Sequence, residues 1–191
     1  MALTQYYTAT TLDGFIATTD HSLDWLLSRK TDEGGPAGYA DYIAGVGAMV
    51  MGASTYEWIQ RYTAGEPWSY DIPCWVLTHR RLTPYDGADV RFAEGDVVPL
   101  HREMTEAAGG RNLWVVGGGD LAGQFADAGL LDEVIVSIAP VTLGAGAPLL
   151  PRHVELVTEE VAANGEFAVV RYRVVREGVG TSPQPAPARI S

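Results

Sequence analysis

The sequence predicts a single α/β domain whose central sheet is mostly parallel and is covered by helices on both faces. Short runs at residues 48–51, 75–78 and 112–116 are continuously or mostly apolar, which is typical of strands that are buried on both sides. Segments with a helical spacing of apolar residues separate these runs, and the repeated order of strand, helix and strand indicates parallel pairing. The last two strand-like runs, 154–161 and 166–175, are joined by a short turn, which predicts antiparallel strands at the edge of the sheet.

The individual elements follow from the same patterns. Residues 3–17 alternate as a strand that Asp13 and Gly14 interrupt, and residues 18–38 are typical of a loop. A short helix is predicted over residues 39–46, because its apolar side chains share one face. The remaining strands are expected at residues 48–51, 75–78, 90–92, 112–116, 133–141, 154–161 and 166–175. The remaining helices are expected at residues 55–61, 98–108 and 121–128.

Composition excludes several classes of function. The chain has 191 residues and a formal net charge of −11, which does not suit the basic face that a long nucleic-acid groove requires. No apolar run reaches the length of a membrane helix, and the single cysteine, Cys74, excludes an internal disulfide. We therefore expect a cytoplasmic protein that binds neither nucleic acid nor a membrane. The domain is expected to cover residues 1–177, and residues 178–191 form a tail rich in Pro, Ala and Ser that we expect to lack fixed structure.

Two glycine-rich turns come directly after buried strands, and a helical pattern follows each of them. They cover residues 51–55 and 116–120. Backbone N–H groups in such turns and at helix N-termini bind phosphate, and ligands of open α/β sheets bind at the carboxyl ends of the strands. Ser54 and Thr55 can alternatively serve only to cap the helix. Two such turns in one small domain favour a dinucleotide as the ligand.

Other common site signatures are missing from the sequence. The dinucleotide fingerprint G-x-G-x-x-G stands near the first strand with an acidic residue about 20 positions later, whereas the run Gly117–Gly119 comes late in this chain. The four histidines have no metal-type spacing with one another or with Cys74, so we expect no metal. The G-x-S-x-G elbow of serine hydrolases is also absent.

The two turns also carry a resemblance to known enzymes. Residues 52–57 (GASTYE) resemble the G-x-x-T-[WY]-E turn of dihydrofolate reductases, and residues 116–125 (VGGGDLAGQF) are similar to their I-G-G-G-x-x-x-x-Q-F segment. Residues 11–17 (TLDGFIA) resemble instead the S-L-D-G-x-I-A strand of the riboflavin-biosynthesis reductases, the C-terminal half of bifunctional deaminase-reductases. Segments 131–134 and 139–144 look like the same second group. The matches occur in the expected order, and their joint spacing makes the resemblance specific.

The resemblance implies a three-layer α/β/α fold of the dihydrofolate reductase type and NADPH as the cofactor. Motif position implies that the pyrophosphate is lined by Gly52, Ser54, Thr55, Gly117, Gly118, Gly119, Asp120 and Leu121. It also implies that Thr78, His79 and Arg80 lie near the adenosine 2′-phosphate. Arg80 and Arg81 suit that phosphate because guanidinium groups pair with it bidentately, although a solvated strand end is the alternative explanation. Ala53 stands where dihydrofolate reductases have a basic residue, so one of these arginines must supply that charge.

Three residues are candidates for the substrate side, and each has a purely structural alternative. Asp13 either lines the nicotinamide pocket or caps the local bulge through backbone N–H groups. Trp25 resembles a loop tryptophan that closes over the substrate, or it is a packing anchor. Ser137 either points at the substrate or satisfies its hydroxyl within the core. Neither family's catalytic acid has a convincing equivalent here.

The function expected from this resemblance is NADPH-dependent reduction of a small heteroaromatic substrate, of the 5-amino-6-(5-phosphoribosylamino)uracil reductase type. A dihydrofolate reductase is one alternative, and a catalytically inactive nucleotide-binding protein is the other. We also expect a homodimer, because related reductases dimerise and the C-terminal antiparallel strands leave an edge that needs covering.

Overall fold

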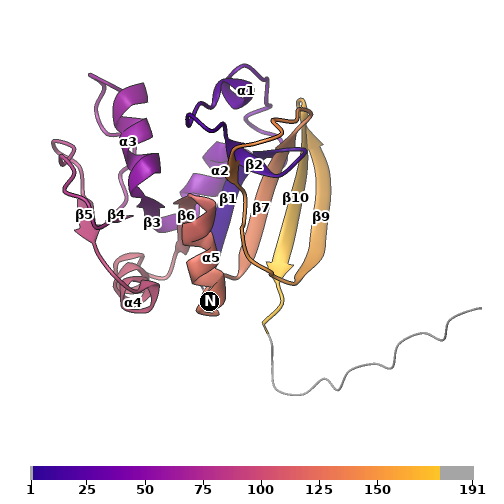
Figure 1. The fold of residues 1–191 in the computed structure, drawn as a ribbon. Coiled ribbons are helices and arrows are strands. Elements are labelled where there is room, and N and C mark those ends of the chain that lie inside the picture. The colour runs from indigo at the N-terminus through magenta and orange to yellow at the C-terminus, as the bar shows by residue number, and fades with distance from the viewer. Residues whose placement is uncertain (1, 177–191) are drawn as a thin grey trace, which may run out of the picture.

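A computed structural model describes residues 2–176 and shows one eight-stranded sheet with helices on both faces (Figure 1). The expected tail from residue 178 lies outside the described residues. The strands are β1 (Thr4–Thr11), β2 (Phe15–Ala17), β3 (Val46–Gly52), β4 (Cys74–Leu77), β5 (Val90–Ala93), β6 (Asn112–Gly117), β7 (Glu133–Ala139), β8 (Ala147–Pro148), β9 (Leu156–Asn164) and β10 (Phe167–Val174). The helices are α1 (Asp24–Leu27), α2 (Tyr39–Ala44), α3 (Ala53–Tyr62), α4 (Val97–Ala107) and α5 (Gly119–Asp127).

The order of the strands places the ends of β3 and β6 next to each other. The main sheet runs β5-β4-β3-β6-β1-β7-β10-β9, and the first six of these strands are parallel. β10 is antiparallel to both β7 and β9, as the sequence predicts for the C-terminal edge. Met51 of β3 is in register with Gly117 of β6, so both glycine-rich turns leave the sheet at the same edge.

The core lies on both faces of the sheet because successive side chains of the central strands point to opposite sides. In β3, Ala48 and Val50 belong to the cluster that α4 and α5 cover, whereas Met49 and Met51 belong to the cluster on the other face. All four are fully buried, which explains the continuous apolar run of this strand. Cys74 is buried in the second cluster, where burial raises the pKa of its thiol.

The structure confirms the predicted element types and corrects several boundaries. The loop predicted over residues 18–38 contains the four-residue helix α1, and the two-residue strand β8 lies between the predicted strands 133–141 and 154–161, where no element was predicted. The turn between β9 and β10 is Gly165–Glu166 and not residues 163–165, because Asn164 still pairs with Phe167. Over the described residues, none of the helices combines the length and the apolar character that crossing a bilayer requires.

A small second sheet lies near the carboxyl ends of the parallel strands. β2 pairs antiparallel with β8, and Phe15 is opposite Pro148 in this pair. Figure 1 shows β2 beside the upper ends of β1 and β7 and facing the gap next to α3. This sheet therefore brings residues from the start and from the last third of the chain to the edge where the glycine-rich turns lie.

Candidate functional site

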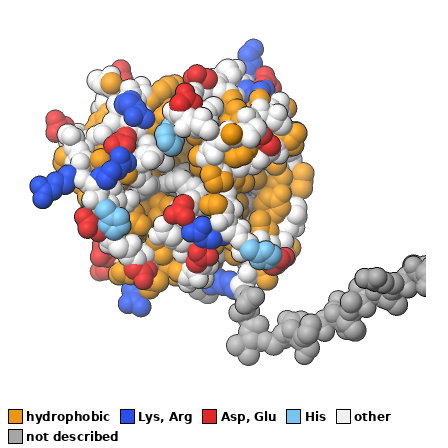
Figure 2. All heavy atoms as spheres, viewed as in Figure 1, with side chains coloured by type: hydrophobic (Ala, Val, Ile, Leu, Met, Phe, Trp, Pro, Cys, Tyr) orange, Lys and Arg blue, Asp and Glu red, His pale blue; other side chains and the backbone are white. Residues whose placement is uncertain are grey.

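A cavity of about 540 Å³ lies at the carboxyl ends of the parallel strands. Figure 2 shows a hollow near the middle of the face on which Figure 1 places the beginnings of α3 and α5 and the strand β2. The volume is in the usual range for small-molecule sites, and ligands of α/β sheets bind at this edge. The position and the size of the cavity therefore make it the candidate functional site.

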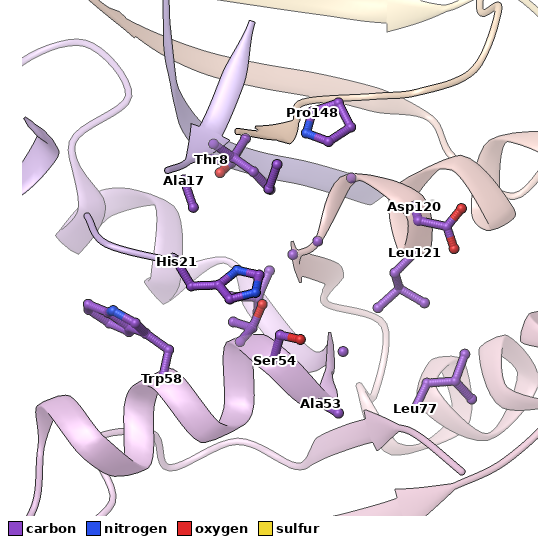
Figure 3. Close-up of a pocket in the computed structure, with 18 of the residues that line it drawn as sticks. Thr8, Ala17, His21, Ala53, Ser54, Trp58, Leu77, Asp120, Leu121 and Pro148 are labelled. Atoms are coloured by element: carbon purple, nitrogen blue, oxygen red, sulfur yellow. The ribbon is translucent and has the colours of Figure 1, made fainter. Parts of the chain in front are cut away.

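Two sets of residues line most of this cavity. The turn side is formed by Gly52, Ala53, Ser54, Thr55, Gly117, Gly118, Gly119, Asp120 and Leu121. The apolar side is formed by Thr8, Ile16, Ala17, His21, Leu23, Trp58, Ile59 and Tyr70. In Figure 3, His21 and Trp58 lie on one side of the cavity, and Asp120 and Leu121 lie across from them. The site thus has a polar backbone wall and a wall of mostly apolar side chains.

The turn side presents two helix N-termini that no side chain caps. α3 begins after Gly52 and α5 begins after Gly118, and neither N-cap residue offers a side-chain acceptor. In contrast, α4, which begins outside the cavity, is capped by Asp96, whose carboxylate accepts from the Val98 N–H at 2.7 Å. The first N–H groups of a helix have no partner within the helix. The two helices at the cavity therefore keep these donors, and their positive dipole ends, for a ligand.

Gly119 is required by close packing against the small second sheet. A Cβ atom at this position would lie 2.2 Å from the carbonyl oxygen of Pro148 and 2.4 Å from that of Leu149. At Gly52, in contrast, the nearest atoms to a Cβ would be 3.9 Å away, on Gly117 and Gly118. The glycine of α5 therefore lets β8 approach the turn, and the glycine before α3 leaves open space beside it.

Asp120 is the one carboxylate of the turn side, and it is already paired. Its Oδ1 accepts from Arg152 Nη2 at 2.7 Å, and its Oδ2 accepts from Gln124 Nε2 at 3.0 Å. These hydrogen bonds, first from Gln124 and then from Arg152, lower the pKa of Asp120. Arg152 also pairs with Asp127 at 2.9 Å. Asp120 is thus a fixed anion at the rim and does not supply protons near neutral pH.

His21 projects into the cavity from a tightly held turn between β2 and α1. Its φ of 62° is in the left-handed region, where residues other than glycine are uncommon. The turn is closed by hydrogen bonds from the His21 N–H to the Thr18 carbonyl oxygen at 3.0 Å and from the Ser22 N–H to Thr18 Oγ1 at 2.8 Å. Figure 3 shows the imidazole above Ser54 and next to Trp58. The backbone geometry therefore directs this side chain toward the ligand space.

Eight of the eleven predicted cofactor residues line the cavity, and three do not. Gly52, Ser54, Thr55, Gly117, Gly118, Gly119, Asp120 and Leu121 are on the turn side, whereas Thr78, His79 and Arg80 lie just beyond the lining residue Leu77. Thr78 is buried, and its Oγ1 accepts from the Arg80 N–H at 3.0 Å. The Arg80 guanidinium is bidentate with Glu57, at 3.1 and 3.0 Å. The exposed His79 is 3.9 Å from Glu94.

None of the three predicted catalytic residues lines the cavity, which corrects the expectation that they face the ligand. The Asp13 carboxylate accepts from the N–H groups of Leu143 and Gly144 and from Thr11 Oγ1, at 3.0, 2.7 and 2.6 Å. The hydrogen bond from Thr11 is the largest cause of the lowered pKa of Asp13, followed by those from Gly144 and Leu143. Asp13 therefore acts as the local cap that was its alternative role.

Trp25 belongs to a core cluster, and the half-buried Ser137 does not line the cavity. Trp25 is buried against Ala139 and Phe167, and its indole N–H has no acceptor among the described residues. Ser137 stands in β7 opposite Ala9 and Val169. The packing alternative therefore fits Trp25, and the structure gives Ser137 no contact with the ligand space.

Sequence reasoning missed the residues that form the apolar side. Trp58 follows Ser54 by four residues, so the helical repeat of α3 alone could have placed it on the face of the turn. His21 gave no such signal, because it lies in an aperiodic loop whose path is set by tertiary contacts. Tyr70 also comes from an irregular segment, and burial raises the pKa of its phenol.

Comparison with known proteins identifies the family. The family model of the RibD C-terminal domain matches residues 4–170. The chain is 35% identical over 146 residues to the uncharacterized protein YwjB of Bacillus subtilis (strain 168), which covers 76% of this chain and 81% of YwjB. It is 26% identical over 148 residues to the uncharacterized protein YyaP of the same organism, which covers 74% of this chain and 76% of YyaP.

Solved structures support the same placement. A putative riboflavin biosynthesis protein from Shewanella sp. PV-4 has a TM-score of 0.77 and 26% identity, over 92% of this chain and 100% of that chain. A deaminase and 5-amino-6-(5-phosphoribosylamino)uracil reductase from Thermotoga maritima has a TM-score of 0.60 and 16% identity, over 91% of this chain and 57% of that chain, which shows the shared fold. The chain has the dihydrofolate reductase-like fold and belongs to the RibD C-terminal domain family.

Proposed function

We propose that this protein is an NADPH-dependent reductase of a small heteroaromatic compound. The observation that carries the proposal is that two helix N-termini without side-chain caps open onto one cavity from neighbouring strands. A diphosphate needs several N–H donors and a positive potential, and both helices offer these at the same place. Family membership supports a reductase over other dinucleotide-binding enzymes.

The residues of the turn side fit the diphosphate of a nicotinamide dinucleotide. N–H groups of residues 53–55 would hold it from one side, and those of residues 119–121 would hold it from the other. When bound, NADPH supplies a hydride to an electrophilic carbon of the substrate. The chain's own contribution is to orient the two molecules between the turn side and the apolar side, and to exclude water from the space between them.

The reaction also needs a proton, and two groups of the apolar side can exchange one. His21 projects into the cavity, where its ring nitrogens can hold a water molecule. Tyr70 also lines the cavity, and because burial raises the pKa of its phenol it keeps its proton at neutral pH. We assign proton delivery to a water molecule that His21 holds.

Binding of the cofactor is the direct test. Isothermal titration with NADPH and with NADH should give saturable binding, with the tighter binding for NADPH. Adenosine 2′,5′-bisphosphate, which carries the 2′-phosphate without nicotinamide, should compete with NADPH. The proposal fails if neither dinucleotide binds, or if Arg80→Ala and Arg81→Ala both leave the ratio of the two affinities unchanged.

A nucleotide-binding protein without turnover is the second candidate function, and one observation favours it. Among the described residues, no carboxylate lines the apolar side, and none of the three predicted catalytic residues lines the cavity. A decrease of absorbance at 340 nm with dihydrofolate or with a riboflavin-pathway pyrimidine would exclude this candidate. Tight NADPH binding with no oxidation by any substrate would favour it.

A further inference from the structure

The apolar side of the cavity contains two aromatic side chains that neighbouring aromatic residues hold in place. Trp58 is stacked on Tyr62 at 4.7 Å with an interplanar angle of 12°, so its indole is held on α3. Tyr70 packs edge-on against Trp68 at 5.1 Å and against Trp114 at 6.0 Å. Flat aromatic side chains held by their neighbours in this way offer preformed contacts to a flat ligand.

The described part of the cavity contains no lysine or arginine. Over residues 2–176, the charged or titratable side chains that line it are His21, Asp120 and Tyr70. Arg152 follows the lining residue Pro151, but its guanidinium is taken by Asp120 and Asp127. Figure 2 shows acidic and basic side chains interspersed over this face, with no large basic patch at the hollow. A substrate phosphate would therefore meet no permanent positive charge there.

The N–H groups of the turn side are not available to a phosphate group of the substrate. In the proposed function they hold the diphosphate of the cofactor, and that diphosphate places further negative charge beside the substrate. A phosphate ester on the substrate would then be desolvated beside an anion and against lining residues that include no lysine or arginine, which is unfavourable without a paired cation. The formal net charge of −11 adds repulsion at longer range.

We propose that the substrate of this site is an uncharged, planar heteroaromatic compound that carries no phosphate ester. The inference rests on the proposed function, because it assumes that the cofactor occupies the turn side. It narrows the substrate class: the ring lies against the apolar side near Trp58, and any ribosyl or polyol substituent is unphosphorylated.

Pairs of ligands that differ only by a phosphate group test this inference. Uridine and uridine monophosphate, guanosine and guanosine monophosphate, and riboflavin and flavin mononucleotide cover a range of ring sizes. Each is titrated calorimetrically into the full chain, with saturating NADP⁺ and without it. At least one unphosphorylated member should bind, and its phosphate ester should bind at least about tenfold more weakly because of the unpaired charge.

A variant that adds a cation makes the test independent of the choice of ring. Leu23 is half-buried, lines the cavity and lies in a loop just before α1, so Leu23→Arg places a guanidinium at the apolar side. This variant should bind the phosphate ester at least about tenfold more tightly and the unphosphorylated partner about equally well. Leu27→Arg, at an exposed position of the helix that follows Leu23 and outside the lining, is the matched control and should change neither affinity.

The outcomes separate this inference from the proposed function. Equal or tighter binding of a phosphate ester by the wild-type chain overturns the inference, and so does failure of every unphosphorylated member to bind while NADP⁺ binds. Failure of NADP⁺ to bind contradicts the proposed function, and the titrations without cofactor then decide the preference of the cavity for or against phosphate.

Discussion

At the scale of single residues, the ion pair between Arg80 and Glu57 decides how well the protein can distinguish NADPH, which carries a 2′-phosphate, from NADH. The guanidinium is bidentate with Glu57, and their side chains are 53% and 33% exposed. Such an exposed pair contributes only about 0.2–1 kcal/mol, so an incoming phosphate can displace the carboxylate. Glu57 is then an anion next to a second anion, which weakens the preference for NADPH.

Glu57→Gln should therefore strengthen NADPH binding more than NADH binding. The amide removes the competing charge and leaves Arg80 in place, so we expect the affinity ratio to rise up to about fivefold, the upper end for an exposed pair. Arg80→Ala should lower the same ratio. Calorimetric titration of both dinucleotides measures the ratio, and increased salt should reduce the effect of both variants.

The control for this prediction is a similar ion pair that does not border the cavity. Arg91 is paired with Asp89 at 2.8 Å, and the two side chains are 46% and 50% exposed. Asp89→Asn releases this arginine without bringing a cation to the site, so it should leave the ratio unchanged. An equal rise of the NADPH-to-NADH affinity ratio in Glu57→Gln and in Asp89→Asn would mean that overall charge, and not Arg80, sets the preference for NADPH.

The sequence predicted the backbone part of the site better than its side chains. Gly52 and Gly117 were found because strand ends and glycines are local signals that fix where N–H groups point. Asp13 and Trp25 were chosen from motifs that do occupy the right loops, but hydrogen bonds to residues 143–144 and packing on Phe167 direct them elsewhere. Such long-range contacts have no local signature.

At the scale of elements, α5 and β8 form one contact on which the turn side depends. The backbone of β8 approaches Gly119 closely enough that a methyl group would overlap two carbonyl oxygens. A Cβ atom added at Gly123 would likewise lie 2.7 Å from Cγ of Arg152, which is in the segment that follows β8. Two glycines one helical turn apart therefore give α5 a flat face on which the chain from β8 to Arg152 rests.

Gly119→Ala should destabilise the protein by about 1–3 kcal/mol, because the contact with Pro148 and Leu149 is backbone and cannot rotate away. Gly45→Ala is the control: its Cβ would be 3.5 Å from the Tyr42 carbonyl oxygen, and its φ of −83° suits alanine. We expect that variant to stay within about 0.5 kcal/mol of the wild type. Urea unfolding measures both, and equal effects would contradict the proposed contact.

Asp13 joins two segments that are far apart in the sequence, the β1–β2 turn and the loop between β7 and β8. Because hydrogen bonds lower the pKa of Asp13 in the folded state, the carboxylate contributes stability above its unfolded-state pKa of about 3.9. That contribution is lost as the pH falls through the lower, folded-state pKa. Asp13→Asn should therefore lower Tm at pH 7, and the difference from the wild type should shrink below pH 4.

The comparison for this prediction is an aspartate on the surface without such hydrogen bonds. Asp86 is exposed in the loop before β5, and its carboxylate accepts no hydrogen bond among the described residues. Asp86→Asn should leave the dependence of Tm on pH unchanged. A constant difference between Asp13→Asn and the wild type from pH 3 to pH 7 would show that ionisation of Asp13 does not stabilise the loop.

Long periodic elements were predictable, and the shortest ones were not. The runs that became β3 and β6 are apolar throughout because both faces of those strands are buried. α1 and β8 have only four and two residues, and they form because Trp25 enters a core cluster and Phe15 pairs with Pro148. Neither contact produces a periodic pattern in the local sequence, so neither α1 nor β8 could be predicted from that sequence alone.

At the scale of the whole molecule, the two edge strands of the sheet, β5 and β9, are each paired on one side only within the described chain, and β9 is the longer, with nine residues against four. This strand bonds to β10 on one side, and most of its side chains are exposed. Val161 and Val157 are 69% and 41% exposed there. Open edge strands with apolar side chains are sites of association, which is the physical basis for expecting a homodimer.

The homodimer stays a prediction, and β9 is where we expect the contact. Light scattering after size-exclusion chromatography should give twice the 20.5 kDa mass of one chain. Val161→Glu should reduce this to the mass of one chain, because two glutamates would face each other across a symmetric contact. Leu27→Glu introduces the same charge at another exposed apolar position, away from β9, and should leave the dimer intact. A wild-type chain that stays monomeric at its highest soluble concentration contradicts the prediction, and a dimer that Val161→Glu does not weaken places the contact elsewhere.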